Sequence, residues 1–236
     1  MTRKTRNRLG AFLILLFTAQ LLFANGGQEP GTIVSLSGEN LEKIMNDKNE
    51  REKYHIIDVR EANEYSEGHV RYAINISVRE IENRTKEISD WKDKNVVVLC
   101  RSGKRSRQAA EILKKQGFTH LFNADGVASY NYAALTTIPN IRGHQLQMLA
   151  DAGTHSIVDF REKQDFSTSH IKGAVHAAVG ALSEAAAMLP KDKPVLVYSY
   201  SGAHSLSGAE QLAAAGYTVI NSIDGTKDAP QFRLVP

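Results

Sequence analysis

The sequence predicts an α/β protein that contains two copies of one domain, each a parallel β-sheet flanked by helices on both faces. Two observations support this prediction. Short apolar runs alternate with amphipathic helical segments, an alternation typical of parallel sheets. In addition, the segment 56–61 (IIDVRE) recurs as 157–162 (IVDFRE), 101 residues later. A repeat of that length indicates a duplicated domain, because the units of solenoid proteins are shorter.

The elements of the first copy follow from its residue pattern. Strong helix formers with apolar residues at helical spacing predict helices over 39–45 and 106–116. Short apolar runs predict strands over 54–59, 96–99 and 120–123.

The two copies set the expected domain boundaries. We expect the first domain, the catalytic one, over 33–136 and the second over 142–236. The linker is placed within Thr136–Arg142, because Pro139 and its polar neighbours interrupt the apolar pattern there.

The N-terminal segment has the layout of a secretory signal. A basic stretch (2–8) precedes an apolar core (9–24), and a polar, turn-rich linker (25–32) follows. We therefore expect 1–24 to be a signal peptide and the protein to be exported, to the periplasm in a bacterium. Leu22 stands where a small residue is preferred before the cleavage site, so an uncleaved membrane anchor is the alternative.

Charge and cysteine content exclude several classes of protein. The formal net charge of +3 becomes −1 without the four basic residues near the N-terminus, which argues against a nucleic-acid partner. The chain has a single cysteine, Cys100, so no intramolecular disulfide can form.

Cys100 is the candidate nucleophile. It directly follows the apolar run 96–99, and the basic residues Arg101, Lys104 and Arg105 follow it before a predicted helix. Cations and a helix N-terminus both lower the pKa of a thiol. The alternative is that Cys100 serves only as a small, buried apolar side chain and has no catalytic role. The basic loop favours the catalytic interpretation, with residues 101–106 binding an anion.

The second copy keeps the scaffold of this loop and loses its chemistry. Cys100, Arg101, Lys104 and Arg105 are replaced by Ser199, Tyr200, Ala203 and His204. We therefore expect an inactive second domain. A serine nucleophile with His204 as its base is the alternative, and it would need a third group to orient the base.

An acidic and a basic residue after the first repeated strand are a further candidate. Asp58 and Arg60 recur as Asp159 and Arg161. Because both copies keep the pair, its expected role is structural, fixing the loop after the strand. The alternative is that Asp58 and Arg60 orient the active loop.

In these residues the chain resembles the rhodanese family of sulfurtransferases, in the tandem two-domain form. The matching elements are the DVRE segment with Glu64-Tyr65 and Gly68-His69, the loop Cys-Arg-Ser-Gly-Lys-Arg-Ser after a strand, and Asp125-Gly126-Val127. The resemblance implies that the Cys100 thiolate takes sulfur from an anionic donor such as thiosulfate and holds it as a persulfide. The acceptor would be cyanide, a thiol or a partner protein.

The same resemblance implies the roles of the loop residues. Backbone N–H groups from Arg101 to Ser106, through Ser102, Gly103, Lys104 and Arg105, would bind the substrate sulfur, and neither a metal nor an organic cofactor is required. The chain departs from the family at three positions: Tyr72 stands in place of the usual glycine, Asp125 in place of glycine and Tyr130 in place of tryptophan.

The length of the loop distinguishes sulfur transfer from phosphate hydrolysis and arsenate reduction. Four residues separate Cys100 from Arg105, whereas cysteine phosphatases and related arsenate reductases have five. The shorter loop favours sulfur over a tetrahedral oxyanion. A module that only carries sulfur, or only binds a partner, is the other alternative.

Overall fold

The computed structural model describes residues 31–228 and 232–236. The expected signal peptide (1–24) and most of the expected 25–32 linker therefore lie outside the described residues. Within the described part, no helix is long and apolar enough to cross a membrane.

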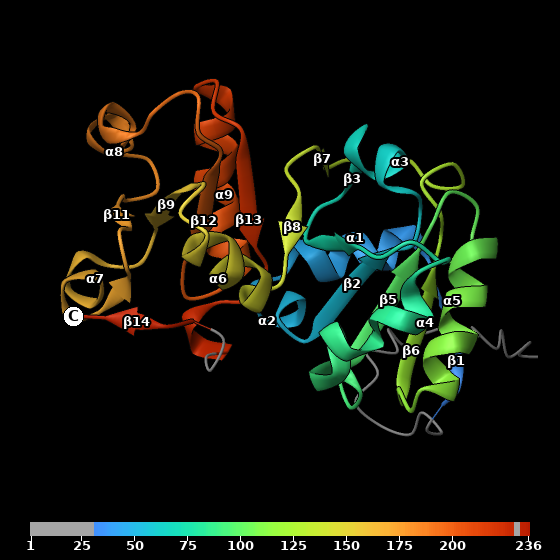
Figure 1. Cartoon of the computed structure of the whole chain (residues 1–236). Coiled ribbons are helices and arrows are strands. Elements are labelled where there is room, and N and C mark those ends of the chain that lie inside the picture. The colour runs from blue at the N-terminus through green and yellow to red at the C-terminus, as the bar shows by residue number, and fades with distance from the viewer. Residues whose placement is uncertain (1–30, 229–231) are drawn as a thin grey trace, which may run out of the picture.

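The two halves of the chain have similar orders of elements (Figure 1). The first half contains, in order, β1 (Ile33–Leu36), α1 (Gly38–Asn46), α2 (Lys48–Arg51), β2 (Tyr54–Asp58), α3 (Ala62–Ser66), β3 (His69–Val70), β4 (Ala73–Asn75), α4 (Ile81–Arg84), the 3-10 helix η1 (Thr85–Trp91), β5 (Asn95–Leu99), α5 (Lys104–Lys115), β6 (His120–Ala124) and β7 (Leu135–Thr136). The second half contains β8 (Asn140–Ile141), α6 (Gly143–Asp151), β9 (Ser156–Asp159), α7 (Lys163–Thr168), β10 (His170–Ile171), β11 (Val175–His176), α8 (Ser183–Met188), β12 (Val195–Tyr198), α9 (Gly202–Ala214), β13 (Val219–Ser222), the 3-10 helix η2 (Thr226–Asp228) and β14 (Leu234–Val235).

A single parallel sheet runs through both halves. In the described residues it has ten strands in the order β1-β6-β5-β2-β4-β8-β13-β12-β9-β11, and neighbouring strands pair in parallel. The predicted α/β class is confirmed. All carboxyl ends of these strands therefore lie along the same edge of the sheet, which is where ligands bind in open α/β sheets.

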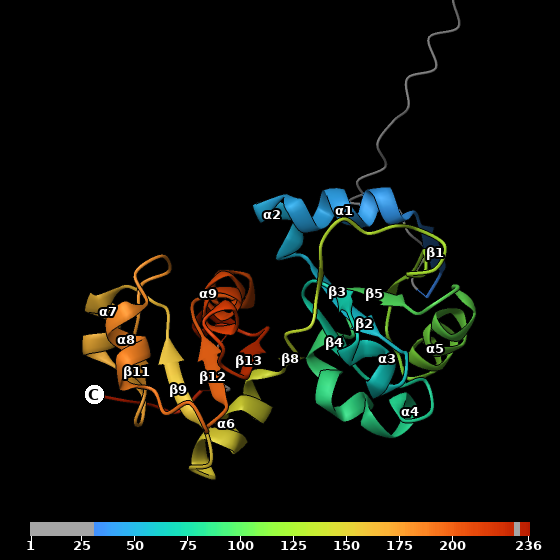
Figure 2. The same ribbon diagram turned by 90° about the horizontal axis from the view of Figure 1, so that it is seen from above.

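Helices cover both faces of the sheet, as predicted. In β5, Val96 and Val98 pack in the core beneath α4 and α5, whereas Val97 and Leu99 pack on the opposite side with α1. Figure 2 shows α1 and α4 on opposite sides of these strands. Because both faces are buried, the strand is continuously apolar from Val96 to Leu99 rather than alternating.

The predicted linker contributes a strand of its own. Strand β8 pairs with β4 of the first half and with β13 of the second, and so makes the sheet continuous. Arg142, which follows β8, is 1% exposed and donates to Asp90 (2.7 Å) and Asp224 (2.8 Å). Its guanidinium also lies over the ring of Trp91, 4.3 Å from the centroid. A charge buried this deeply is tolerated because it is paired on both sides.

Tyr72 packs between the two halves. Its φ of 66° lies in the left-handed region, which explains why the resemblance predicts glycine there. The tyrosine ring contacts the core clusters of both halves and is flanked by the guanidinium groups of Arg51 and Arg71. The aromatic contacts offset the backbone strain.

Candidate active site

The candidate nucleophile lies at the carboxyl edge of the sheet. Cys100 follows β5, which has β6 and β2 as its neighbours, and its side chain is fully buried. The chain then turns through 101–103 into α5. Gly103 makes this turn with a φ of 85°, a left-handed conformation that suits glycine.

The segment that follows β6 supports the loop through backbone hydrogen bonds. Val127 N–H donates to the Cys100 carbonyl (3.0 Å) and Ala128 N–H donates to the Arg101 carbonyl (2.9 Å). Gly126 lies so close that a Cβ there would be 2.2 Å from the Arg101 oxygen, so no larger residue fits. The Oδ2 of Asp125 accepts from the N–H of Gly38, the first residue of α1, at 2.9 Å, while Ser37 is the N-cap of that helix. The departure from the family at this position therefore has a structural role.

The loop stabilises the thiolate. Burial alone would raise the pKa of Cys100, but hydrogen bonds from the Ser106 hydroxyl and from the backbone N–H groups of Ser106, Ser102 and Gly103 lower it below its ordinary value. The Ser106 Oγ lies 3.4 Å from the sulfur, and Ser106 is itself fully buried. The sequence suggested that nearby cations lower this pKa; in the structure, hydrogen bonds from the loop are the main cause.

The basic residues divide into two groups. Arg105 donates to both oxygens of Glu64, at 2.6 and 2.8 Å, and this pairing lowers the pKa of Glu64 to about 2. Arg107 lies 3.8 Å from Glu111. Arg101 and Lys104 are exposed, and their side chains form no ion pair within the described part of the chain. These two residues are the cations available at the mouth of the loop.

Sequence reasoning did not assign Glu64 to the site. Glu64 accepts from the Glu61 N–H at the start of α3, in a capping box. The spacing of the two glutamates is therefore a signal of helix capping, and the contact with Arg105 follows only from the fold. The ion pair between Glu64 and Arg105 holds α3 against the catalytic loop.

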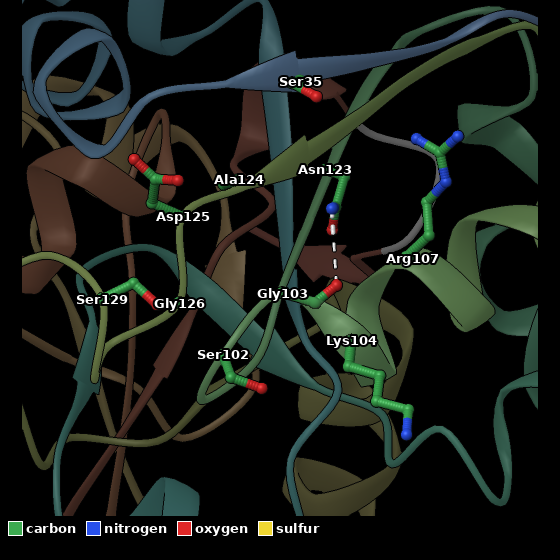
Figure 3. Close-up of a pocket in the computed structure, with 10 residues that line it drawn as sticks. All are labelled: Ser35, Ser102, Gly103, Lys104, Arg107, Asn123, Ala124, Asp125, Gly126 and Ser129. Atoms are coloured by element: carbon green, nitrogen blue, oxygen red, sulfur yellow. Dashed lines mark hydrogen bonds between the residues drawn. The ribbon is translucent and has the colours of Figure 1, made fainter.

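A cavity of about 550 Å³ lies beside the loop. Ser102, Gly103 and Lys104 line it on one side, and Asn123 and Ser35 reach it from β6 and β1 (Figure 3). Cys100 does not line this cavity. Within the described residues, no cluster of three or more histidine, cysteine or acidic side chains could hold a metal ion.

Asp58 and Arg60 lie at the end of β2. They form a buried ion pair (2.6 Å), and Arg60 also donates to the carbonyl of Gly68 at 2.7 Å. Asp159 and Arg161 repeat the pair at 2.7 Å. Within the described residues, the side-chain bonds of Arg60 fix the turn before β3 and do not reach residues 100–106. This geometry favours the structural interpretation of the pair.

The loop of the second copy has a different backbone. Ser201 is extended (φ −146°), and α9 begins at Gly202, whose N–H donates to the Ile223 carbonyl. The N–H groups of His204 and Ser205 donate to the Ser201 carbonyl. The N–H groups of Gly202 and Ser205, the counterparts of Gly103 and Ser106, therefore donate to backbone carbonyls and not to residue 199.

Ser199 and His204 are in contact, as the serine alternative requires. The Ser199 Oγ lies 2.7 Å from the His204 Nδ1, and Ser199 is fully buried. The ring of Tyr200 lies beside His204, 6.3 Å between centroids, and its hydroxyl hydrogen-bonds to Asp165. A serine nucleophile also needs donors for an oxyanion, and among the described residues the N–H groups of Gly202 and Ser205 are bonded to backbone carbonyls instead.

The fold and the first loop define a class: an α/β protein with a cysteine thiolate held by the backbone amides of a loop at the start of a helix. A family model described as "Rhodanese-like domain" matches residues 38–129 and 144–228. The chain therefore belongs to the rhodanese family and contains two such domains.

Known relatives agree with this assignment. The thiosulfate sulfurtransferase PspE of Escherichia coli (strain K12) is 42% identical over 73 residues, which cover 31% of this chain and 70% of PspE. The thiosulfate sulfurtransferase GlpE of Pseudomonas savastanoi is 33% identical over 91 residues, which cover 39% of this chain and 85% of GlpE. A solved structure of a rhodanese from E. coli with anions is 37% identical, covering 35% of this chain and 96% of that one, with a TM-score of 0.33. The family model and the two sulfurtransferases similar in sequence support sulfur transfer as the general function.

Proposed function

We propose that this protein moves the sulfane sulfur of thiosulfate, or of a similar anionic donor, to cyanide or a thiol through a persulfide on Cys100. The observation that carries the proposal is the Ser106 hydroxyl, 3.4 Å from the buried sulfur, in a loop whose backbone N–H groups at Ser102, Gly103 and Ser106 help to lower the pKa of Cys100. Such donors stabilise negative charge on sulfur without any cofactor.

The first half-reaction loads the cysteine. The Cys100 thiolate attacks the outer sulfur of thiosulfate, a new S–S bond forms, and sulfite leaves with the electron pair of the broken bond. Arg101 and Lys104, exposed at the mouth of the loop, attract the dianionic donor. The negative charge that Cys100 carried is then on the outer sulfur of the persulfide.

The second half-reaction removes the outer sulfur from Cys100. A nucleophile such as cyanide attacks the outer sulfur, thiocyanate leaves, and the Cys100 thiolate is restored. The chain has one cysteine, so the acceptor must come from outside this chain. A thiol or a partner protein fills this role outside an assay.

The position of Arg105 supports sulfur transfer over phosphate chemistry. A phosphatase loop needs an arginine that reaches around a tetrahedral oxyanion. Arg105 instead uses both terminal nitrogens to bind Glu64, and only four residues separate it from Cys100.

A turnover assay tests the proposal. We expect the purified chain to convert thiosulfate and cyanide to thiocyanate, Cys100→Ser to abolish the reaction, and Ser199→Ala to leave it unchanged. Turnover that survives Cys100→Ser would refute the assignment. A Cys100 persulfide with negligible turnover would instead identify a sulfur-carrier module.

We also propose that the protein is exported, on the basis of the N-terminal sequence. Cell fractionation and sequencing of the N-terminus test this: export and cleavage near Ala24 are expected. Recovery from the cytoplasm with residues 1–24 intact would contradict it, and recovery from the membrane would indicate an uncleaved anchor.

A further inference from the structure

His69 lies between two backbone carbonyl groups, and its side chain is fully buried. Its Nδ1 lies 2.9 Å from the carbonyl oxygen of Tyr65, on α3, and its Nε2 lies 3.1 Å from that of Ile138, in the linker before β8. A carbonyl oxygen can only accept a hydrogen bond, so each ring nitrogen needs a proton of its own. A neutral imidazole has one N–H and one bare nitrogen, and it can therefore satisfy only one of the two contacts.

The second copy indicates which contact belongs to the shared scaffold. His170 corresponds to His69, and its Nδ1 lies 2.9 Å from the carbonyl oxygen of Phe166, on α7. In both copies the histidine and the carbonyl are four residues apart. Among the described residues, the Nε2 of His170 has no backbone carbonyl as a partner. The Nδ1 contact is therefore common to both copies, and the contact between Nε2 and Ile138 is particular to the first.

The surroundings of His69 both favour and oppose a positive charge on its ring. The ring of Tyr65 stacks on it with 3.6 Å between centroids, and the face of an aromatic ring attracts a cation. Asp58 also favours the charge and Arg60 opposes it, and these two residues form an ion pair with each other. Burial is the largest cause and lowers the pKa of His69 below its ordinary value of 6.5. The ring is therefore mainly neutral at pH 7 and gains a proton in more acidic solution.

We propose that His69 is a proton-dependent clamp between α3 and the linker. In the neutral ring, Nδ1 keeps its proton and donates to Tyr65, while the bare Nε2 faces the oxygen of Ile138 and the two lone pairs repel each other. Protonation places a hydrogen on Nε2, which then donates to Ile138. Because the closed clamp binds this proton more tightly than the open clamp, a fall in pH favours the closed junction.

The clamp acts where the two halves of the chain meet. The linker continues into β8, which lies between the halves (Figure 1), and there Asn140 donates its backbone N–H to the hydroxyl of Tyr65 at 3.1 Å. Tyr65 thus contacts β8 through its hydroxyl and His69 through its ring and carbonyl. The preceding residue, Glu64, binds Arg105 of the catalytic loop. Proton binding at His69 therefore fixes β8 against the helix that contacts this loop, whether or not the proposed function holds.

NMR of the histidine ring nitrogens tests the proposal without any substitution. The full chain is prepared with isotope-labelled histidine, and the protonation of Nδ1 and Nε2 of His69 is followed from about pH 8 to about pH 4.5, on both sides of the ordinary pKa. At the upper end, Nδ1 alone should carry a proton; at the lower end, both nitrogens should. A neutral ring protonated on Nε2, or a ring that gains no proton in this range, would overturn the proposal.

Hydrogen exchange of the Asn140 amide measures the junction itself. After correction for the intrinsic effect of pH, its protection should increase roughly tenfold as His69 gains its proton, the lower end of the effect of one hydrogen bond to a charged group. Protection that does not change with pH in the wild-type chain would overturn the proposal.

Two matched substitutions provide the controls. His69→Gln replaces the ring by an amide that does not titrate, so the protection of Asn140 should no longer depend on the charge at this position. His170→Gln changes the corresponding residue of the second copy and should leave the pH dependence as it is in the wild type. An equal pH dependence in the wild type and His69→Gln would refute the clamp. If His69→Gln folds poorly, the titration of the wild-type ring decides.

Discussion

Among the described residues, Ser106 carries the one side-chain hydroxyl that donates to the catalytic sulfur, and replacing Ser106 with alanine removes this donor. The Ser106 Oγ is 3.4 Å from the Cys100 Sγ, and both residues are 0% exposed. A hydrogen bond to a charged group contributes about 1.5 to 3 kcal/mol, and sulfur is a weak acceptor, which favours the lower end. Since one pKa unit corresponds to about 1.4 kcal/mol, the pKa of Cys100 should rise by about one unit.

The assay is a titration of thiolate absorbance, which reports only Cys100 because the chain has no other cysteine. Below the pKa, kcat/KM for thiosulfate should fall about tenfold in Ser106→Ala, following the thiolate fraction. The matched control is Ser205→Ala in the second copy, which should leave the pKa of Cys100 unchanged. If Ser106→Ala titrates at or below the wild-type pKa, the Ser106 hydroxyl does not activate the sulfur.

Three further predictions concern the support of the loop and the junction between the halves. Gly126→Ala should reduce turnover more than tenfold, because a displacement of the reacting groups by about 1 Å is enough to slow the reaction this much. The matched variant Gly225→Ala, whose Cβ would lie 1.8 Å from a carbonyl oxygen of the second loop, should lower only Tm. Equal activities of the two variants would contradict this prediction. Tyr72→Gly removes backbone strain of about 1 kcal/mol, but it also removes a ring that packs on both cores. Urea unfolding should therefore show a net decrease of about 1 to 2 kcal/mol in the free energy of unfolding. A variant more stable than the wild type would refute this interpretation. Glu64 has a lowered pKa of about 2 in the folded chain. Its contribution to stability is therefore present above its unfolded pKa of about 4.3 and is lost as the pH falls toward 2. The difference in the free energy of unfolding between wild type and Glu64→Gln should shrink over that range, and a constant difference would argue against the ion pair.

The sequence predicted the features that depend on neighbouring residues. The apolar run of β5 and the amphipathic pattern of α5 are local signals, so their bounds differ from the prediction by at most two residues at each end. The repeat predicted the paired architecture for the same reason, since each copy carries its own pattern. Cys100 was identifiable because a thiol between a buried strand and a helix is a local arrangement.

Contacts between distant segments were not predictable in this way. Arg142 looked like a polar linker residue, yet it is buried because Asp90 and Asp224 approach it from separate parts of the chain. Strand β8 is two residues long, too short for any periodicity, and its role in joining the sheet depends on its neighbours. Glu64 contacts Arg105 across 41 positions of sequence. The cations near Cys100 were visible in the sequence, but the directions of the loop N–H groups were not.

The central claim, that Cys100 carries sulfur as a persulfide, is tested most directly by the intact mass of the protein after incubation with thiosulfate. The account predicts a gain of one sulfur atom in the wild-type chain, its loss on addition of cyanide, and no gain in Cys100→Ser. An unchanged mass in the wild-type chain, or the same gain in Cys100→Ser, would contradict the account.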